Sequence, residues 1–194
     1  MRKLIQLILI LLTCNHLATA QDSESFYKTG YDLRNSGSFE KSATLFSFGL
    51  GFPNSAVLHE HSGKPPLYIK YEHGFMRDEI GWGAYASYGW GAFNRKGYDI
   101  SFNAFNVSSL MYYHFNKIIP VKQLDLYIGI GMGYRHISYS DADPIALTGT
   151  SDDNVIGAIR LGLRYYIVPK LAFYAETGYD GMSNINFGAT FKFK

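Results

Sequence analysis

Residues 124–135 read LDLYIGIGMGYR, a stretch in which two kinds of side chain alternate from one position to the next. The even-numbered positions, from Leu124 to Tyr134, carry large apolar side chains, and the odd-numbered positions carry glycine, Tyr127 or a charge. A period of two is that of a β-strand, whose successive side chains point to opposite faces of a sheet. The stretch therefore predicts a strand with one apolar face and one small or polar face.

Seven further segments from residue 43 onward alternate in the same way. The segment 102–115 is the least clear of them, because both of its faces carry aromatic residues. Eight strands, each about ten residues long, are typical of a barrel that crosses a membrane. We therefore predict an all-β fold: an eight-stranded antiparallel up-and-down transmembrane β-barrel over residues 43–194.

The connections between the predicted strands alternate in length, which orients the barrel. Those at 75–78, 116–122 and 168–170 are short, those at 53–65 and 137–153 are long, 91–101 is intermediate, and 180–183 is short against the trend. Outer-membrane barrels have short periplasmic turns and longer extracellular loops. We expect both chain termini and the three short turns to face the periplasm.

The composition excludes several other classes of protein. Hydrophobic residues make up 47% of the chain and the formal charge is only +2, so the chain is neither disordered nor a nucleic-acid binder. No apolar run approaches the ~20 residues of a membrane-spanning helix. A soluble lipocalin-like barrel remains an alternative. It fits less well, because the small or polar face is rich in glycine, serine and tyrosine, and the apolar face carries no charge on the clear strands.

The N-terminus has the three parts of a secretory signal peptide. Arg2 and Lys3 precede an apolar stretch from Leu4 to Leu12, and Ala18 and Ala20 are small residues before the expected cleavage site. We predict a signal peptide over residues 1–20, cleaved between Ala20 and Gln21 after Sec-type export. Residues 21–42 are then predicted to be a periplasmic N-terminal segment, with a plug inside the barrel as the alternative.

Seven charged residues fall on the predicted inner face of the barrel. An eight-stranded barrel has a narrow interior filled by side chains, and buried charges are normally paired. We therefore predict a salt-bridge network in the lumen, made of Lys70, Glu72, Asp125, Arg135, Arg160, Arg164 and Glu176. A gate or proton path built from the same residues is the functional alternative.

Aromatic residues on the apolar face predict contact with the two membrane interfaces. Trp82 and Trp90 lie eight residues apart, which at ~3.3 Å per residue and ~40° tilt corresponds to roughly 20 Å, close to the separation of the two aromatic girdles. Tyr134, Tyr165 and Phe193 are predicted to belong to the same belts.

The chain resembles the small outer-membrane β-barrel proteins of Bacteroidota over most of its predicted mature length. The resemblance rests on SFGLGFPN (47–54), PPLYIKYE (65–72), IGWGAY (80–85) and NFGATFKF (186–193). The last stretch is similar to the C-terminal signal read by the barrel-assembly machinery, although Lys194 follows the final phenylalanine. More distantly, the chain looks like eight-stranded barrels of the OmpA and OmpX type. The resemblance implies a fold and an outer-membrane location rather than an activity.

One cluster could carry catalysis. His136 and Ser138, two residues apart on the predicted lipid face, resemble the pair used by outer-membrane lipid A deacylases. There the histidine takes the serine proton and a carboxylate orients the histidine. Asp152 or Asp153 could supply that carboxylate.

We predict a non-enzymatic surface protein with an envelope-structural or contact role through its extracellular loops. A lipid A acyl hydrolase and a small-solute pore are the alternatives. The expected partners are outer-membrane lipids, lipopolysaccharide and, during insertion, the barrel-assembly machinery. We expect a monomer with no nucleic-acid partner, no cofactor and no bound metal.

Overall fold

The computed structural model describes residues 38–54, 64–95, 98–119, 121–140 and 151–193. They form eight β-strands, which are β1 (Thr44–Pro53), β2 (Leu67–Gly74), β3 (Ile80–Arg95), β4 (Tyr98–His114), β5 (Leu124–Ser140), β6 (Ser151–Val168), β7 (Leu171–Tyr179) and β8 (Ser183–Phe193). Within this part of the chain, no helix is long and apolar enough to cross a membrane.

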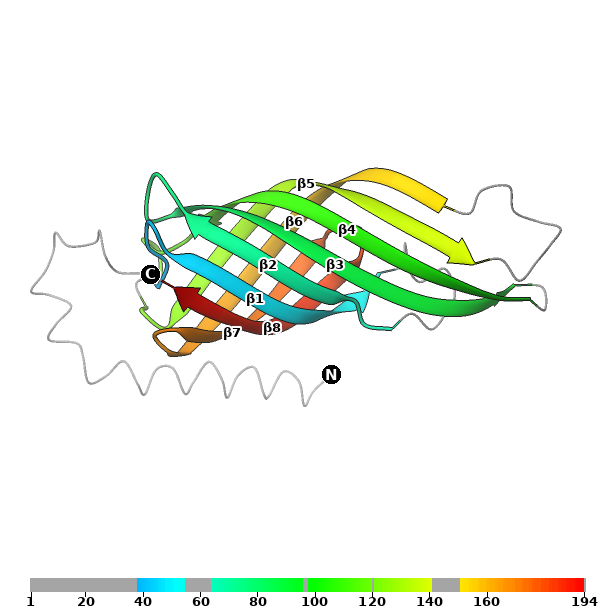
Figure 1. The fold of residues 1–194 in the computed structure, drawn as a ribbon. Coiled ribbons are helices and arrows are strands. Elements are labelled where there is room, and N and C mark those ends of the chain that lie inside the picture. Colours follow the sequence, from blue (N-terminus) through cyan, green and yellow to red (C-terminus); the bar gives the residue numbers. More distant parts are fainter. Residues whose placement is uncertain (1–37, 55–63, 96–97, 120, 141–150, 194) are drawn as a thin grey trace, which may run out of the picture. The chain divides into compact units, whose positions relative to one another are not determined.

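The strands follow one another around a closed antiparallel barrel, so the predicted fold class is confirmed (Figure 1). The seam closes where β1 pairs with β8, with Thr44 opposite Phe193. The alternation of side chains separates two faces: Phe48, Ile69 and Phe173 are half exposed on the outside, whereas Tyr127 is fully buried inside. The interior is thus closed by side chains, while the outer surface is apolar.

Figure 1 shows that β3–β6 reach well beyond the other four strands at one end of the barrel. These strands have 16 to 18 residues, not about ten as the sequence suggested. The predicted loop 91–101 is for the most part strand, because β3 and β4 stay paired as far as Arg95 and Tyr98. These strands are longer than expected because their pairing and the alternation of their side chains continue past the length needed to cross a membrane. We call residues 89–95, 98–104, 137–140 and 151–158 the extension.

The short connection between β7 and β8 also differs from an ordinary loop. It lies at the extension end of the barrel, which we call the top. Its residues Asp180 and Met182 are completely buried, as is Ser183 at the start of β8. Gly181 adopts a φ of 79°, a conformation that glycine tolerates best. This turn bends into the barrel instead of projecting from it, which explains its shortness.

The opposite end, which we call the base, carries the β2–β3, β4–β5 and β6–β7 connections and the end of β8. Residues 38–42, which the sequence analysis assigned to a periplasmic segment, are packed against this end. Phe39 is 1% exposed and forms an apolar cluster with Ala43 and Leu45. The Ser42 amide donates a hydrogen bond to the Gly74 carbonyl, at 2.9 Å. The compact part of the barrel therefore begins before residue 43.

Candidate functional site

The charged residues predicted for the lumen are all buried, and the structure shows which of them meet. Arg164 on β6 contacts Glu72 on β2 and also Asp125 on β5, the latter at 3.0 Å. Strands β2 and β6 are separated by three strands in either direction around the barrel, so the Arg164–Glu72 pair crosses its full width.

A histidine that the sequence analysis did not select completes this group. His114, with no exposed surface, places Nδ1 2.7 Å from Asp125 and Nε2 2.7 Å from Glu72. Both carboxylates also accept hydrogen bonds from Arg164. Both ring nitrogens therefore act as donors, as they do only in the imidazolium form. Two cations and two anions form a neutral cluster, which we call the base quartet.

A second ionic group lies higher in the lumen. Lys70 on β2 pairs with Glu176 on β7 and donates a hydrogen bond to the Asn186 side chain at 2.9 Å. Its ammonium lies between 4.7 and 5.8 Å from the ring centres of three tyrosines, which are Tyr68, Tyr85 and Tyr174. Such contacts stabilise a cation that has been removed from water.

Tyr127 joins the second group to the base quartet. Its hydroxyl donates to Glu176 at 2.7 Å, and its ring lies 4.0 Å from the Arg164 guanidinium. Gly162 makes room for this ring, because a Cβ atom there would approach Tyr127 to 2.2 Å. A glycine on the inner face thus permits the tyrosine to lie across the lumen.

The third group forms at the top and depends on another residue that sequence reasoning missed. Arg160 pairs with Asp180, which is completely buried in the inward-bent turn. The same carboxylate accepts hydrogen bonds from the Tyr68 hydroxyl at 2.9 Å and from the backbone amides of Met182 and Ser183 at 2.9 and 3.0 Å. Asp180 therefore has two roles: it fixes the turn and it neutralises Arg160.

Arg135 belongs to the top as well. It donates to the Gly181 carbonyl at 3.0 Å and lies 3.5 Å from the half-exposed Asp152. Among the other buried charges described above, the cations His114, Lys70, Arg160 and Arg164 face the anions Glu72, Asp125, Glu176 and Asp180. The charges of these eight groups balance.

The base of the barrel is closed by Phe39. Its ring stacks on the His114 imidazole with the ring centres 3.5 Å apart and an interplanar angle of 5°. Asn116 donates from its side-chain amide to the Phe39 carbonyl at 2.9 Å, which fixes the backbone. The sequence signal for this contact is weak, because Phe39 lies in a polar segment outside the alternating strands.

The aromatic residues predicted for the membrane interfaces lie on the outer face in two levels. Trp82, Tyr165 and Phe193 lie near the base ends of their strands and are 43 to 53% exposed. Trp90 and Tyr134 lie closer to the top. The Trp82 indole donates to the Ser109 hydroxyl at 2.9 Å, which satisfies a polar group on the apolar surface.

Ser138 lies on the outer face of the extension, and His136 lies on the same face of β5 directly below it. Asp153 stands opposite His136 on β6, and its carboxylate is 2.7 Å from Nδ1 of the histidine. Asp152, the other candidate carboxylate, stands opposite the buried Ile137 and contacts Arg135, so it does not orient His136. Among the described residues, no hydrogen bond joins Ser138 to His136. The structure brings together a histidine and a carboxylate, without the serine.

A closed eight-stranded antiparallel barrel with an apolar outer face and a side-chain-filled interior is the architecture of small outer-membrane barrels. The comparison with solved structures agrees with this class. The outer membrane protein OprG from Pseudomonas aeruginosa is 14% identical, with a TM-score of 0.56, 81% of this chain covered and 98% of that chain. This likeness establishes the fold.

Two further structures have lower similarity scores. The N-terminal β-barrel domain of OprF from Pseudomonas aeruginosa is 17% identical (TM-score 0.49; 79% of this chain and 99% of that chain). Ail of Yersinia pestis, solved with the heparin analogue sucrose octasulfate, is 16% identical (TM-score 0.48; 79% and 98%). No family model and no curated protein matches the chain.

Proposed function

We propose that the protein is a non-enzymatic β-barrel of the bacterial outer membrane that presents the extension and the loops at its tip on the cell surface, in an envelope-structural or contact role. The observation that carries this proposal is the unequal length of the strands. Four strands end near one level, whereas β3–β6 continue beyond it. The continued part lies beyond the level at which all eight strands pair, so we expect its outer side and its tip to provide a surface for contact.

The outer face supports the membrane location. Its half-exposed side chains include Phe48, Phe52, Ile69, Phe173 and Phe187. A soluble monomer rarely exposes a continuous apolar surface of this size, whereas lipid covers it completely. The soluble lipocalin-like alternative would have to leave this face in water. The predicted signal peptide and cleavage after Ala20 fit the same export route.

The filled lumen argues against the small-solute pore. The Arg164–Glu72 pair crosses the barrel, Phe39 covers the base, and the turn with Asp180 and Met182 fills the top. Packed and mutually bonded side chains leave the solute no continuous water path. Planar-bilayer recordings are expected to show no discrete conductance steps.

The orientation can be tested with single cysteines, because the only cysteine of the chain, Cys14, lies in the predicted signal peptide. Ser151→Cys places a thiol in the extension, and Lys170→Cys places one in the β6–β7 turn at the base. We expect a membrane-impermeant maleimide to label the first in intact cells and the second only after lysis. Both variants should also show heat-modifiable mobility in the outer-membrane fraction.

The wild-type chain is the control for background labelling. Equal labelling of both variants in intact cells would contradict the orientation. Recovery of the protein from the soluble periplasmic extract, without a mobility shift between boiled and unboiled samples, would contradict the membrane location itself.

A lipid A acyl hydrolase is the second candidate function, and the His136–Asp153 hydrogen bond is the observation that favours it. Its weakness is the absence of a bond between His136 and Ser138. We expect the acyl count of lipid A to be unchanged when the protein is expressed. A changed count that returns to normal in Ser138→Ala would establish the enzyme and overturn the non-enzymatic role.

A further inference from the structure

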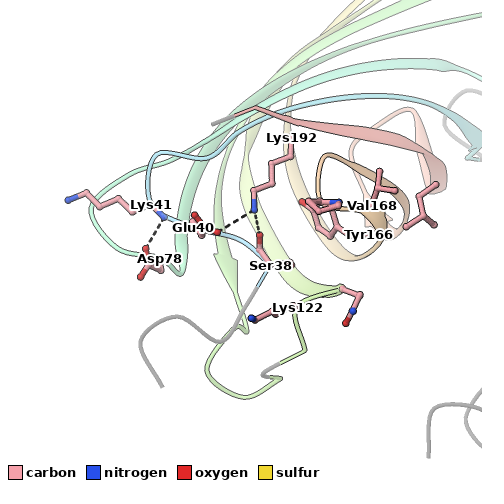
Figure 2. Close-up of a pocket in the computed structure, with 11 residues that line it drawn as sticks. Ser38, Glu40, Lys41, Asp78, Lys122, Tyr166, Val168 and Lys192 are labelled. Carbon is pink, nitrogen blue, oxygen red and sulfur yellow. Dashed lines mark hydrogen bonds and ion pairs between the residues drawn. The ribbon is translucent and has the colours of Figure 1, made fainter. Parts of the chain in front are cut away.

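A pocket of about 680 Å³ opens at the base of the barrel. Figure 2 shows that several separate segments surround it: the N-terminal stretch with Ser38 and Lys41, the connection with Lys122, the end of β6 with Tyr166, and β8 with Lys192. The pocket lies outside the ionic groups of the lumen and has no role in the function proposed above.

Three lysines and two carboxylates line this pocket. The carboxylates are engaged locally: Glu40 lies 3.7 Å from the Lys192 ammonium, and Asp78 accepts a hydrogen bond from the backbone amide of Lys41 at 2.8 Å. Within the described ranges, the ammonium groups of Lys41 and Lys122 form no ion pair. The pocket therefore has a net positive charge. Figure 2 shows the Lys41 ammonium pointing away from the other lining residues, so Lys122 is the cation available to an anion.

Tyr166 provides an independent indication of a ligand. It lines the pocket and is only 5% exposed, yet its hydroxyl has no hydrogen-bond partner among the described residues. Lys192 lies above its ring, 5.7 Å from the ring centre. A buried polar group normally has a partner, so an unpaired phenol in the wall of a pocket suggests that a ligand supplies the acceptor.

The surroundings of the pocket indicate the kind of anion. Ile167 and Val168 line it, are 49 and 51% exposed, and continue the apolar outer face that includes Tyr165. If the barrel spans the outer membrane, these side chains contact the inner-leaflet lipids near the periplasmic surface. Lysine-lined pockets at such a level bind anionic lipid head groups through the phosphate charge.

We propose that this pocket binds the phosphate head group of an anionic phospholipid of the inner leaflet. Lys122 neutralises the phosphate, the Tyr166 hydroxyl donates a hydrogen bond, and Ile167 contacts an acyl chain. The inference rests on the membrane location proposed above. It assigns the site to a lipid and not to a free phosphate, because apolar residues adjoin the cations.

Native mass spectrometry of the full chain in nanodiscs tests the proposal. The nanodiscs contain phosphatidylcholine with a minor fraction of phosphatidylglycerol as the probe. We expect phosphatidylglycerol to remain bound preferentially to the wild type. Affinity should fall about fivefold in Lys122→Gln, and it should fall in Tyr166→Phe. Lys170→Gln is the matched control, because it removes a charge at the same end but outside the pocket lining.

Each other outcome overturns the proposal. The wild type could show no preference for phosphatidylglycerol, or Lys170→Gln could lose as much affinity as Lys122→Gln. Either result would mean that the lipid responds only to the general positive charge at the base. Displacement of the lipid by inorganic phosphate would identify a free phosphate site, and displacement by a peptidoglycan fragment would identify a cell-wall ligand. Heat-modifiable mobility, measured on the same samples, separates these results from a failure of the membrane location: a protein that is inserted but shows no lipid preference disproves only this inference.

Discussion

Replacing Arg164 with methionine is expected to destabilise the folded barrel by about 3–5 kcal/mol, the usual cost of removing one partner from a buried ion pair. The substitution leaves Glu72 and Asp125, which are 3% and 0% exposed, with His114 as their only cation in the base quartet. It also removes the guanidinium that packs against Tyr127. The quantity to measure is the free energy of unfolding in guanidinium chloride, followed by tryptophan fluorescence in detergent micelles.

Arg77→Met is the matched control, because Arg77 is exposed in the β2–β3 turn. We expect it to change the free energy of unfolding by less than about 0.5 kcal/mol. Adding Glu72→Gln to Arg164→Met should recover much of the loss, because it removes the one uncompensated negative charge and leaves Asp125 paired with His114. An Arg164→Met variant as stable as the wild type would contradict an ionic base quartet.

The second large effect is expected at the top of the barrel, in Asp180→Ala. This change removes the counter-ion of Arg160, the acceptor for Tyr68 and the acceptor for two backbone amides of the turn. We again expect a loss of about 3–5 kcal/mol, because a buried arginine is left without its partner. The fraction of the purified protein that runs as the folded, unboiled band should fall in parallel.

Asp153→Ala is the control for this substitution. Its carboxylate also accepts two hydrogen bonds, from Tyr134 and His136, but on the exposed outer face. Exposed pairs contribute about 0–1 kcal/mol, so the loss should be small. Equal losses in the two variants would mean that burial of Asp180 does not govern the stability of the turn.

The fold could be predicted from the sequence because β-barrels carry a period of two along every strand. The alternation around Leu124–Arg135 identified both the strand and its two faces, and it placed Asp125 and Arg135 inward. The length of β3–β6 could not be predicted in the same way. The expectation of about ten residues came from the thickness of a membrane. The alternation of side chains does not change at the residues where the extension begins, so it gives no sign that the strands continue.

The partners of the buried charges could not be predicted from the sequence for a different reason. Which strands face each other across the lumen depends on closure and register, so the Arg164–Glu72 contact follows only from the closed barrel. His114 lies in the segment whose two faces both carry aromatic residues. The alternation there does not distinguish the inner face from the outer face, so the inward position of His114 could not be predicted. Asp180 lies in the short connection 180–183, and nothing in the length or composition of that connection indicates that it bends into the barrel.

The hydrogen bond from Lys192 to the Ser38 carbonyl, 2.6 Å long, joins residues 154 positions apart in the chain. A contact of such long range is slow to form, because closing a long loop costs conformational entropy before the contact stabilises it. The residues before β1 emerge early in synthesis, yet the bond between Ser38 and Lys192 can form only after β8 has been placed. Formation of the Lys192–Ser38 bond therefore reports that β8 has reached the base, and protection of Ser38 from proteolysis would distinguish a completed barrel from one whose seam is still open.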